Sequence, residues 1–283
     1  MRYRFLRFPG GKEKAVTLSY DDGKPEDIRF SEIITSYGLK CTFNLNCKKQ
    51  RDVFLTDEQV QEHFLSKGHE IAVHGALHKA EGCIRPIEGI TDILECRLEL
   101  EKRFGRIIKG MAYPDTGINL FSNNASYESI KNYLKELDIV YARTIDGDNN
   151  SFMLPDDWYS WTPTAHHGNP EIMEYIEEFN SINLSKSTFM PGRAPRLFYM
   201  WGHSFEFERA KNWDLLRKIS DKLGGKDDVW YATNIEIYDY VNAYNNLSYS
   251  ADGTMIYNPA LFEIWLDIDG ETYSIAPGEM LKL

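Results

Sequence analysis

Short apolar runs alternate with longer segments of helical periodicity along most of this chain, and this alternation limits the fold more than any other property of the sequence. Strands that alternate with helices pair in a parallel sheet. We therefore predict an α/β fold, and seven such units favour closure into an irregular barrel over an open sheet. The predicted strands are Ala15–Tyr20, Lys40–Leu45, Glu70–His74, Gly110–Tyr113, Ile139–Ala142, Leu197–Trp201 and Val229–Ala232.

Three segments between these strands carry helix signals. The first begins with a capping box, Thr56-Asp57-Glu58-Gln59, and ends at Gly68, a residue type that often terminates helices. Apolar residues recur at helical spacing over residues 90–101 and again over Tyr127–Leu137.

The alternation weakens between Thr144 and Arg196. Several prolines and the polar run from Asp146 to Asn150 predict long loops in this part of the chain. We expect at most one helix here, near Glu171–Phe179.

The chain changes character after Asn246. Three short strands are predicted over Thr254–Asn258, Phe262–Asp267 and Tyr273–Ala276, with a hairpin turn at Asp269-Gly270. A segment of this size buries little surface by itself, so we expect it to pack on the main domain. The predicted organisation is a barrel over residues 1–245 and a small β-rich extension over residues 246–283.

The composition argues against several classes of partner. The chain has 32 Lys and Arg against 43 Asp and Glu, a net charge of −11, whereas nucleic acid binding depends on cationic side chains. An anionic membrane surface is disfavoured for the same reason, and no run approaches the roughly 20 apolar residues of a spanning helix. Arginines interrupt the segment Met1–Pro9, which lacks the apolar region of a secretory signal. We expect a cytoplasmic protein, and four cysteines without a Cys-x-x-Cys pair favour reduced thiols.

Side chains that can perform chemistry follow most of the predicted strands. In parallel α/β barrels the loops after the strands meet on one rim, and catalytic groups lie there. Residues far apart in the sequence are therefore expected to converge. In chain order they are Asp21, Asp22, His74, His78, Pro114, Asp115, Arg143 and His203.

These residue types favour metal-assisted hydrolysis. One carboxylate and two imidazoles form a three-ligand site with open positions, suited to zinc, ferrous iron or another first-row divalent ion. Successive side chains diverge, so one of Asp21 and Asp22 can bind the ion while the other takes a proton from the metal-bound water. A separate imidazolium can protonate a leaving group. The pattern thus indicates cleavage of an amide or an ester.

The motifs resemble those of the polysaccharide deacetylases of the NodB-homology class, carbohydrate esterase family 4. Leu18–Gly23 stands where that family has Thr-Phe-Asp-Asp-Gly, and His74–His78 where it has His-Ser/Thr-x-x-His. The strand Leu197–Trp201, followed by His203, is similar to the last family motif. The resemblance covers about residues 15–244.

The resemblance implies a distorted (β/α)7 barrel and an acetylated oligo- or polysaccharide as substrate. It implies Asp22, His74 and His78 as ligands of a divalent metal ion, with zinc expected first and cobalt, nickel or iron as alternatives. Asp21 would be the general base and His203 the general acid, with metal-bound water attacking an N- or O-acetyl group. A backbone N–H near Pro114-Asp115 would help to hold the oxyanion.

Two motifs depart from the family pattern. Gly75 replaces a Ser or Thr that orders the metal-binding loop. The third motif, Arg-x-Pro-Tyr in the family, reads Ala112-Tyr113-Pro114-Asp115 and lacks the arginine that pairs with the catalytic aspartate. We hypothesise that Arg143 supplies this positive charge. Tyr113, Pro114, Asp115 and Trp201 are the predicted substrate-binding residues.

The sequence leaves open which acid interacts with the His203 ring and adjusts its pKa. The acid could lie in Asp156-Asp157-Trp158, or be Asp146 or Asp148. The pair His166-His167 could line the cleft, bind a second ion or belong to a surface loop.

Other functions are weaker interpretations of the same residues. A sugar-binding barrel without turnover would explain the altered third motif but not the intact set of acids and histidines. An iron oxygenase with two histidines and a carboxylate generally has a β-sandwich fold, and this chain alternates strands with helices. A glycosidase using Asp21 and Asp22 is disfavoured, because its carboxyl groups stand ~5 Å or more apart across a sugar ring.

Overall fold

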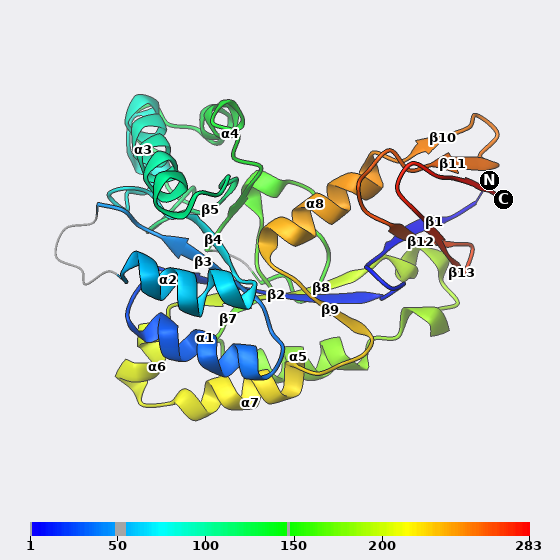
Figure 1. The fold of residues 1–283 in the computed structure, drawn as a ribbon, viewed down its shortest axis with the longest axis horizontal. Coiled ribbons are helices and arrows are strands. Elements are labelled where there is room, and N and C mark those ends of the chain that lie inside the picture. The colour runs from blue at the N-terminus through cyan, green and yellow to red at the C-terminus, as the bar shows by residue number, and fades with distance from the viewer. Residues whose placement is uncertain (1, 49–54, 146–147) are drawn as a thin grey trace.

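The computed structural model describes residues 2–48, 55–145 and 148–283. Its centre is a curled sheet of parallel strands with helices packed around the outside (Figure 1). The strands are β2 (Lys14–Asp21), β3 (Cys41–Leu45), β4 (Glu70–Val73), β5 (Gly110–Ala112), β6 (Tyr141–Arg143), β7 (Ala165–His166), β8 (Arg196–Gly202) and β9 (Val229–Tyr231). Their order is β6-β5-β4-β3-β2-β8-β7, and β9 pairs with the first residues of β2. The predicted α/β fold is confirmed.

The curl brings the two edges of the sheet together. The edge strand β6 forms a parallel bridge from Arg143 to Trp161, shortly before β7, and β7 pairs with β8 on its other side. The N–H of Trp161 donates to the carbonyl of Ala142, and the N–H of Thr144 donates to the carbonyl of Trp161. The sheet is therefore an irregular barrel whose strands end on a common rim.

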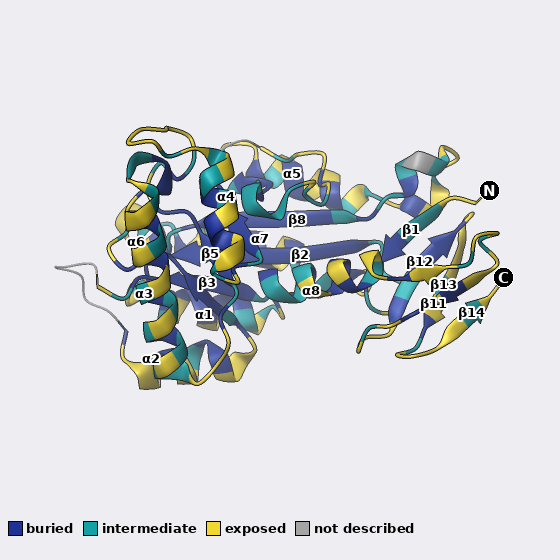
Figure 2. Ribbon diagram, turned by 90° about the horizontal axis from the view of Figure 1, so that it is seen from above, coloured by how far each residue is buried: buried dark blue, intermediate teal, exposed yellow. Residues whose placement is uncertain are grey.

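Strand β2 runs through the middle of the sheet and is buried along its whole length (Figure 2). Successive residues of a strand point to opposite faces. The even-numbered residues from Val16 to Tyr20 enter the apolar cluster beneath the helices. The odd-numbered residues from Thr17 to Asp21 face the other way and form polar contacts. This alternation carries Asp21 to the inside of the barrel.

The helices cover the outer face of the sheet. The predicted capping box is present, since the Thr56 side chain accepts from the N–H of Gln59, and Gly68 ends the following turn with φ 78°. None of the helices in the described part of the chain combines the length and apolar composition needed to cross a membrane. The helices are α1 (Glu26–Ser36), α2 (Asp57–His63), α3 (Pro86–Phe104), α4 (Tyr127–Glu136), α5 (Ile172–Ser181), α6 (Ser204–Ala210), α7 (Trp213–Leu223) and α8 (Asn234–Asn245).

Two strands differ from the expected barrel. The segment 229–232 forms β9, but it lies beside the start of β2 and outside the path of the other strands. Strand β7 lies within the region expected to be loops. A strand of two residues has no periodicity from which it could be predicted, and it exists because Ala165 and His166 find the free edge of β8.

The C-terminal extension forms two small antiparallel sheets. One combines β1 (Arg4–Arg7) with β12 (Ile264–Ile268) and β13 (Glu271–Ile275), and the predicted turn at Asp269-Gly270 joins the last two. The other combines β10 (Ser248–Tyr249), β11 (Met255–Tyr257) and β14 (Met280–Lys282). Figures 1 and 2 place the extension beyond the starting ends of β2 and β8. The boundary at residue 245 stays a prediction, because the first sheet takes strands from both ends of the chain.

A buried cluster of charges ties the extension to the barrel. The carboxylate of Asp267 on β12 lies 3.2 Å from Nη2 of Arg7 on β1 and 2.6 Å from Nη2 of Arg193, which precedes β8. All three side chains are buried. Removing one partner of a buried charge cluster leaves the remaining charges uncompensated, which costs about 3–5 kcal/mol.

We therefore predict that Asp267→Asn lowers the melting temperature by roughly 6–20 °C, at about 2–4 °C per kcal/mol for a chain of this size class. Thermal unfolding followed by circular dichroism measures the change. Asp221→Asn, the same substitution at an exposed position of α7, is the control and should shift the melting temperature by less than about 2 °C. Equal melting temperatures for the two variants would contradict a stabilising role of the cluster.

Candidate active site

Asp21 is the last residue of β2 and lies buried inside the barrel, in contact with polar partners. Its Oδ1 accepts a hydrogen bond of 2.8 Å from Nδ2 of Asn44, and its Oδ2 lies 2.6 Å from Nη2 of Arg143. Burial by itself raises the pKa of the Asp21 carboxyl. The positive charge of Arg143, with contributions from His74, His203 and the Asn44 hydrogen bond, outweighs burial and lowers this pKa below its usual value. Asp21 is thus held as a carboxylate.

Asp22 turns away from the strand at its end. Its φ of 82° lies in the left-handed region, which costs energy for a residue other than glycine and is concentrated at functional sites. The backbone N–H of Asp22 donates to the carbonyl of Asn44, and Nδ2 of Asn46 donates to Oδ1 of Asp22 at 3.0 Å. Strand β3 and the residue just beyond it therefore hold both aspartates in place.

His74 and His78 approach Asp22 from the loop after β4. The carbonyl of Ala112 lies 2.9 Å from Nδ1 of His74, which places the ring proton on Nδ1 and directs the lone pair of Nε2 towards the aspartates. Nε2 of His74 lies 3.9 Å from Oδ1 of Asp22, and Nε2 of His78 lies 3.5 Å from the same oxygen. His78 also has a left-handed backbone, with φ 55°.

This set of side chains fits a divalent metal ion. The ligand atoms of Asp22, His74 and His78 all lie within 4.8 Å of one another. A tetrahedral zinc ion with bonds of about 2.1 Å separates neighbouring ligand atoms by roughly 3.4 Å, close to the two distances above. The tautomer of His74 agrees, because a histidine ligand usually donates its other N–H to a carbonyl or carboxylate.

Gly75 has a structural reason in this chain. Its φ is 71°, and a Cβ at this position would stand 2.5 Å from Oδ2 of Asp92 on α3. Asp92 itself orders the loop between the two histidines: its Oδ1 accepts from the N–H of Leu77, and its carbonyl accepts from the N–H of Ala76. The support expected from a Ser or Thr at position 75 is thus supplied by the carboxylate of Asp92.

Arg143 reaches Asp21 across the barrel from the end of β6. Its guanidinium carbon lies 4.4 Å from the centre of the Trp201 ring on β8, so the cation is held between an aromatic face and a carboxylate. Nε and Nη1 of Arg143 have no hydrogen-bond partner among the described residues. Arg143 thus places its cation against the carboxylate of Asp21, and its part in turnover stays a prediction.

His203 follows β8 and precedes helix α6. Its Nδ1 lies 3.5 Å from Oε1 of Glu206, one turn along the same helix. Burial lowers the pKa of His203, but Glu206, Asp21 and Asp22 together raise it above its usual value. Nε2 of His166 and Nε2 of His167 lie 3.0 Å and 3.2 Å from the other carboxylate oxygen of Glu206. We call these four residues the Glu206 cluster.

The acids suggested for His203 from the sequence have other partners. Asp157 accepts hydrogen bonds from the hydroxyl of Tyr127 and from Lys131. Asp148 contacts Asn169 and Tyr175, Asp156 is exposed, and Asp146 lies outside the described residues. The sequence does carry a signal for Glu206. It lies three residues after His203, which directly precedes a helix, and an acid at this spacing is typical of a capping box.

The predicted substrate-binding residues are not all gathered at the rim. Trp201 lies beside Arg143, with its ring centre 4.8 Å from that of His166. Asp115 is exposed, with φ 52°, in the loop after β5. Tyr113 is packed in the core and donates its hydroxyl hydrogen to the carbonyl of Tyr159, while Pro114 is buried next to it. The side chain of Tyr113 therefore points away from the carboxylates.

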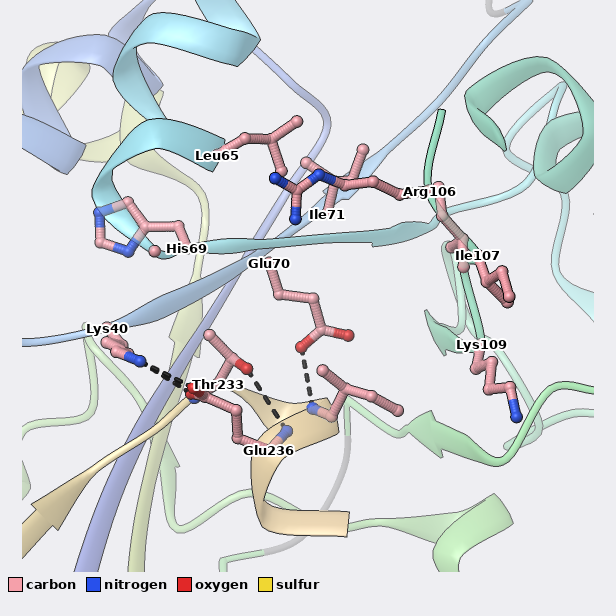
Figure 3. A pocket seen from close by; sticks show the side chains of 13 residues that line it. Lys40, Leu65, His69, Glu70, Ile71, Arg106, Ile107, Lys109, Thr233 and Glu236 are labelled. Carbon is pink, nitrogen blue, oxygen red and sulfur yellow. Dashed lines mark hydrogen bonds and ion pairs between the residues drawn. The ribbon is translucent and has the colours of Figure 1, made fainter. Parts of the chain in front are cut away.

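A separate cavity of about 330 Å³ lies at the opposite ends of the strands (Figure 3). It is lined by Lys40, just before β3, by Glu70 at the start of β4 and by the first residues of α8. Lys40 pairs with Glu236, and Glu70 accepts from the N–H of Ile235. Since these charges pair with each other or with the backbone, we assign them to the packing of α8 under the sheet.

Comparisons with known proteins were made with this geometry in hand. Residues 9–139, which include Asp21, Asp22, His74 and His78, match the family model described as polysaccharide deacetylase. No curated protein sequence matches the chain.

Solved structures share the fold at low sequence identity. One, named as a candidate polysaccharide deacetylase from Mycobacterium smegmatis, has a TM-score of 0.55 and 16% identity, covering 87% of this chain and 96% of its own. The Xyl-CE4 domain of a multidomain xylanase, from the hindgut metagenome of Trinervitermes trinervoides, has a TM-score of 0.51 and 18% identity, covering 85% of this chain and 99% of that domain.

Proposed function

We propose that this chain, whose residues 9–139 match the polysaccharide deacetylase family model, is a metal-dependent hydrolase that removes acetyl groups from an N- or O-acetylated saccharide. The observation that carries this proposal is the arrangement at the end of β2. A carboxylate paired with Arg143 stands directly beside a second carboxylate that two imidazoles approach. One acid is thus equipped as a proton acceptor and the other as a metal ligand.

Asp22, His74 and His78 would hold the metal ion. When bound, a divalent ion acidifies a water molecule and polarises the acetyl carbonyl. Asp21 takes a proton from the attacking water, because Arg143 and Asn44 keep its carboxylate ionised and fixed in orientation. Among these groups Asp21 is the one that combines burial, negative charge and a place beside the ligand set.

His203 would protonate the departing nitrogen or oxygen of the sugar. Its raised pKa favours the imidazolium that a general acid needs. The loop after β5 offers a donor for the developing oxyanion. The N–H of Tyr113 already donates to the carbonyl of Arg143, and proline has no N–H, which leaves the N–H of Asp115.

Acetate release tests the proposal directly. The protein would be loaded with zinc, cobalt or nickel, its metal content measured, and N- and O-acetylated mono-, oligo- and polysaccharides supplied in parallel. We expect one metal ion per chain and release of acetate from at least one substrate class. Bound metal without release from any substrate would instead support a sugar-binding member without turnover.

Replacing a proposed ligand should remove both metal and activity. We predict that His78→Gln lowers the zinc content from about one ion per chain to below about 0.1, and that acetate release falls with it, because a three-ligand site loses most of its affinity with one ligand. Metal analysis after dialysis measures this. His63→Gln on α2, outside the site, is the control and should retain the ion. Full zinc content in the His78 variant would rule His78 out as a ligand.

A further inference from the structure

The Glu206 cluster lies at the carboxyl ends of β7 and β8, next to the proposed general acid. We infer that Glu206 is the positioning residue for His203, and that His166 and His167, whose Nε2 atoms lie close to Oε2 of Glu206, hold Glu206 in place. This inference rests on the proposed function in one respect, the role of His203 as acid. The contacts themselves come from the geometry of the described residues.

The two oxygens of Glu206 face different partners. Oε1 lies 3.5 Å from Nδ1 of His203, while Oε2 lies 3.0 Å from Nε2 of His166 and 3.2 Å from Nε2 of His167. The backbone spacing explains the first contact. His203 precedes α6 and Glu206 is its third residue, so the Glu206 side chain reaches back over the first turn, and its N–H donates to the carbonyl of His203.

The consecutive residues His166 and His167 both reach Oε2 of Glu206 because strand β7 ends between them. Along a regular strand His166 and His167 would point to opposite faces. Strand β7 ends at His166, and a tight turn follows in which the N–H of Asn169 donates to the carbonyl of His166. The ring centres of the two histidines consequently lie only 4.3 Å apart.

The hydrogen bonds around the histidines set their protons. The N–H of Gly168 donates to Nδ1 of His166 at 3.0 Å. Because Nδ1 accepts, a neutral His166 ring carries its proton on Nε2, the atom that lies 3.0 Å from Oε2 of Glu206. The hydroxyl of Tyr20 lies 3.1 Å from Nδ1 of His167, and burial lowers the pKa of His167 to about 3, so this ring is neutral.

The position of the His166 proton distinguishes a cluster of close contacts around Glu206 from a second metal site. The ligand atoms of His166, His167 and Glu206 are close enough together to surround an ion. A metal ion bound by His166, however, needs the lone pair of Nε2, so the ring proton would have to lie on Nδ1. That proton would then face the N–H of Gly168, and two donors do not form a hydrogen bond with each other. As arranged, His166 presents Nε2 to Glu206 beside His203, and a bound ion would require the other tautomer of this ring.

The surroundings of His203 show which charges Glu206 competes with. Glu206 on α6, Asp21 at the end of β2 and Asp22 just after it raise the pKa of His203. Asp27 on α1 also interacts with the charge of His203. Oε1 of Glu206 contacts the His203 ring at Nδ1. An ionised acid at Nδ1 fixes the ring so that Nε2 carries the other proton of the imidazolium.

The test uses zinc-loaded protein and three variants: Glu206→Gln, which keeps the shape and removes the charge, Glu206→Asp, which keeps the charge, and Glu208→Gln, an exposed control on the same helix. We expect Glu206→Gln to lower kcat about 10–100-fold with little change in KM. The alkaline limb of the rate against pH should move to lower pH, since the acid loses its proton more readily. Glu206→Asp should restore the position of that limb, and Glu208→Gln should match the unaltered protein.

Two measurements besides activity decide the inference. NMR titration of the His203 ring in the zinc-loaded protein should show a lower midpoint in Glu206→Gln, and the zinc content should be the same in all variants. An unchanged midpoint and pH limb would overturn the positioning role. A zinc content that falls from two ions to one in Glu206→Gln would identify the cluster as a metal site instead. If no saccharide releases acetate even from the unaltered protein, the proposed function fails, while the NMR titration still decides the role of Glu206.

Discussion

Asp21→Asn should lower kcat for acetate release by about 10²–10⁴-fold, the range that a positioned general base contributes. The structure supplies the reason. Asp21 is buried, ionised through Arg143 and adjacent to the proposed metal ligands, and asparagine cannot accept a proton from water. Zinc content should stay at about one ion per chain, because Asp22, His74 and His78 are unchanged. Steady-state kinetics and metal analysis on the same preparation measure both quantities.

A loss of catalytic activity in Asp21→Asn has to be distinguished from a loss of folded protein. Asparagine leaves the buried Arg143 without its counter-charge, which by itself costs stability. The double variant Asp21→Asn with Arg143→Met removes both charges, so we expect it to regain most of the melting temperature and none of the activity. Activity within about threefold of the unaltered protein in Asp21→Asn would exclude Asp21 as the base.

Arg143→Met should have the second large effect, lowering kcat by about 10²-fold or more and the stability by about 3–5 kcal/mol. Methionine keeps much of the length of the side chain but leaves Asp21 buried without a cation, so the charge and the orientation of the base are both lost. Zinc content should again be unchanged. Kinetics, denaturant unfolding and metal analysis are the three measurements.

Arg143→Lys is the matched comparison for this prediction. Lysine keeps the positive charge but lacks the planar fork that stacks on Trp201, so we expect an activity between those of the methionine variant and the unaltered protein. Turnover unchanged in Arg143→Met would contradict the hypothesis that this residue supplies the charge missing from the third motif.

The strands were predictable where their sequence is long and apolar. β2, β3, β4 and β8 match the predicted runs to within a residue or two, because buried parallel strands need continuous apolar segments. β7 was missed, since two residues carry no period. β1 was also missed; its arginines conceal a strand that pairs with β12 at the other end of the chain.

The candidate site likewise contains residues that the sequence could predict and residues that it could not. Asp21, Asp22, His74, His78 and His203 follow strands that the sequence indicates, so their convergence on one rim follows from the geometry of a parallel barrel. Glu206 was overlooked, although its spacing from His203 is local and could have indicated it. Tyr113 was placed at the substrate on the motif alone, whereas the structure packs it in the core.

The sequence by itself determined which residue types stand at the strand ends, because periodicity and motif spacing are local properties of the chain. Only the tertiary structure decided which of them touch. Arg143 and Asp21 are far apart in sequence and meet at 2.6 Å because the sheet curls until β6 faces β2 across its interior. Likewise His166 and His167 reach Glu206 because β7 pairs with β8 and ends beside α6. Such contacts depend on the curl and register of the whole sheet, and no short segment of the chain encodes them.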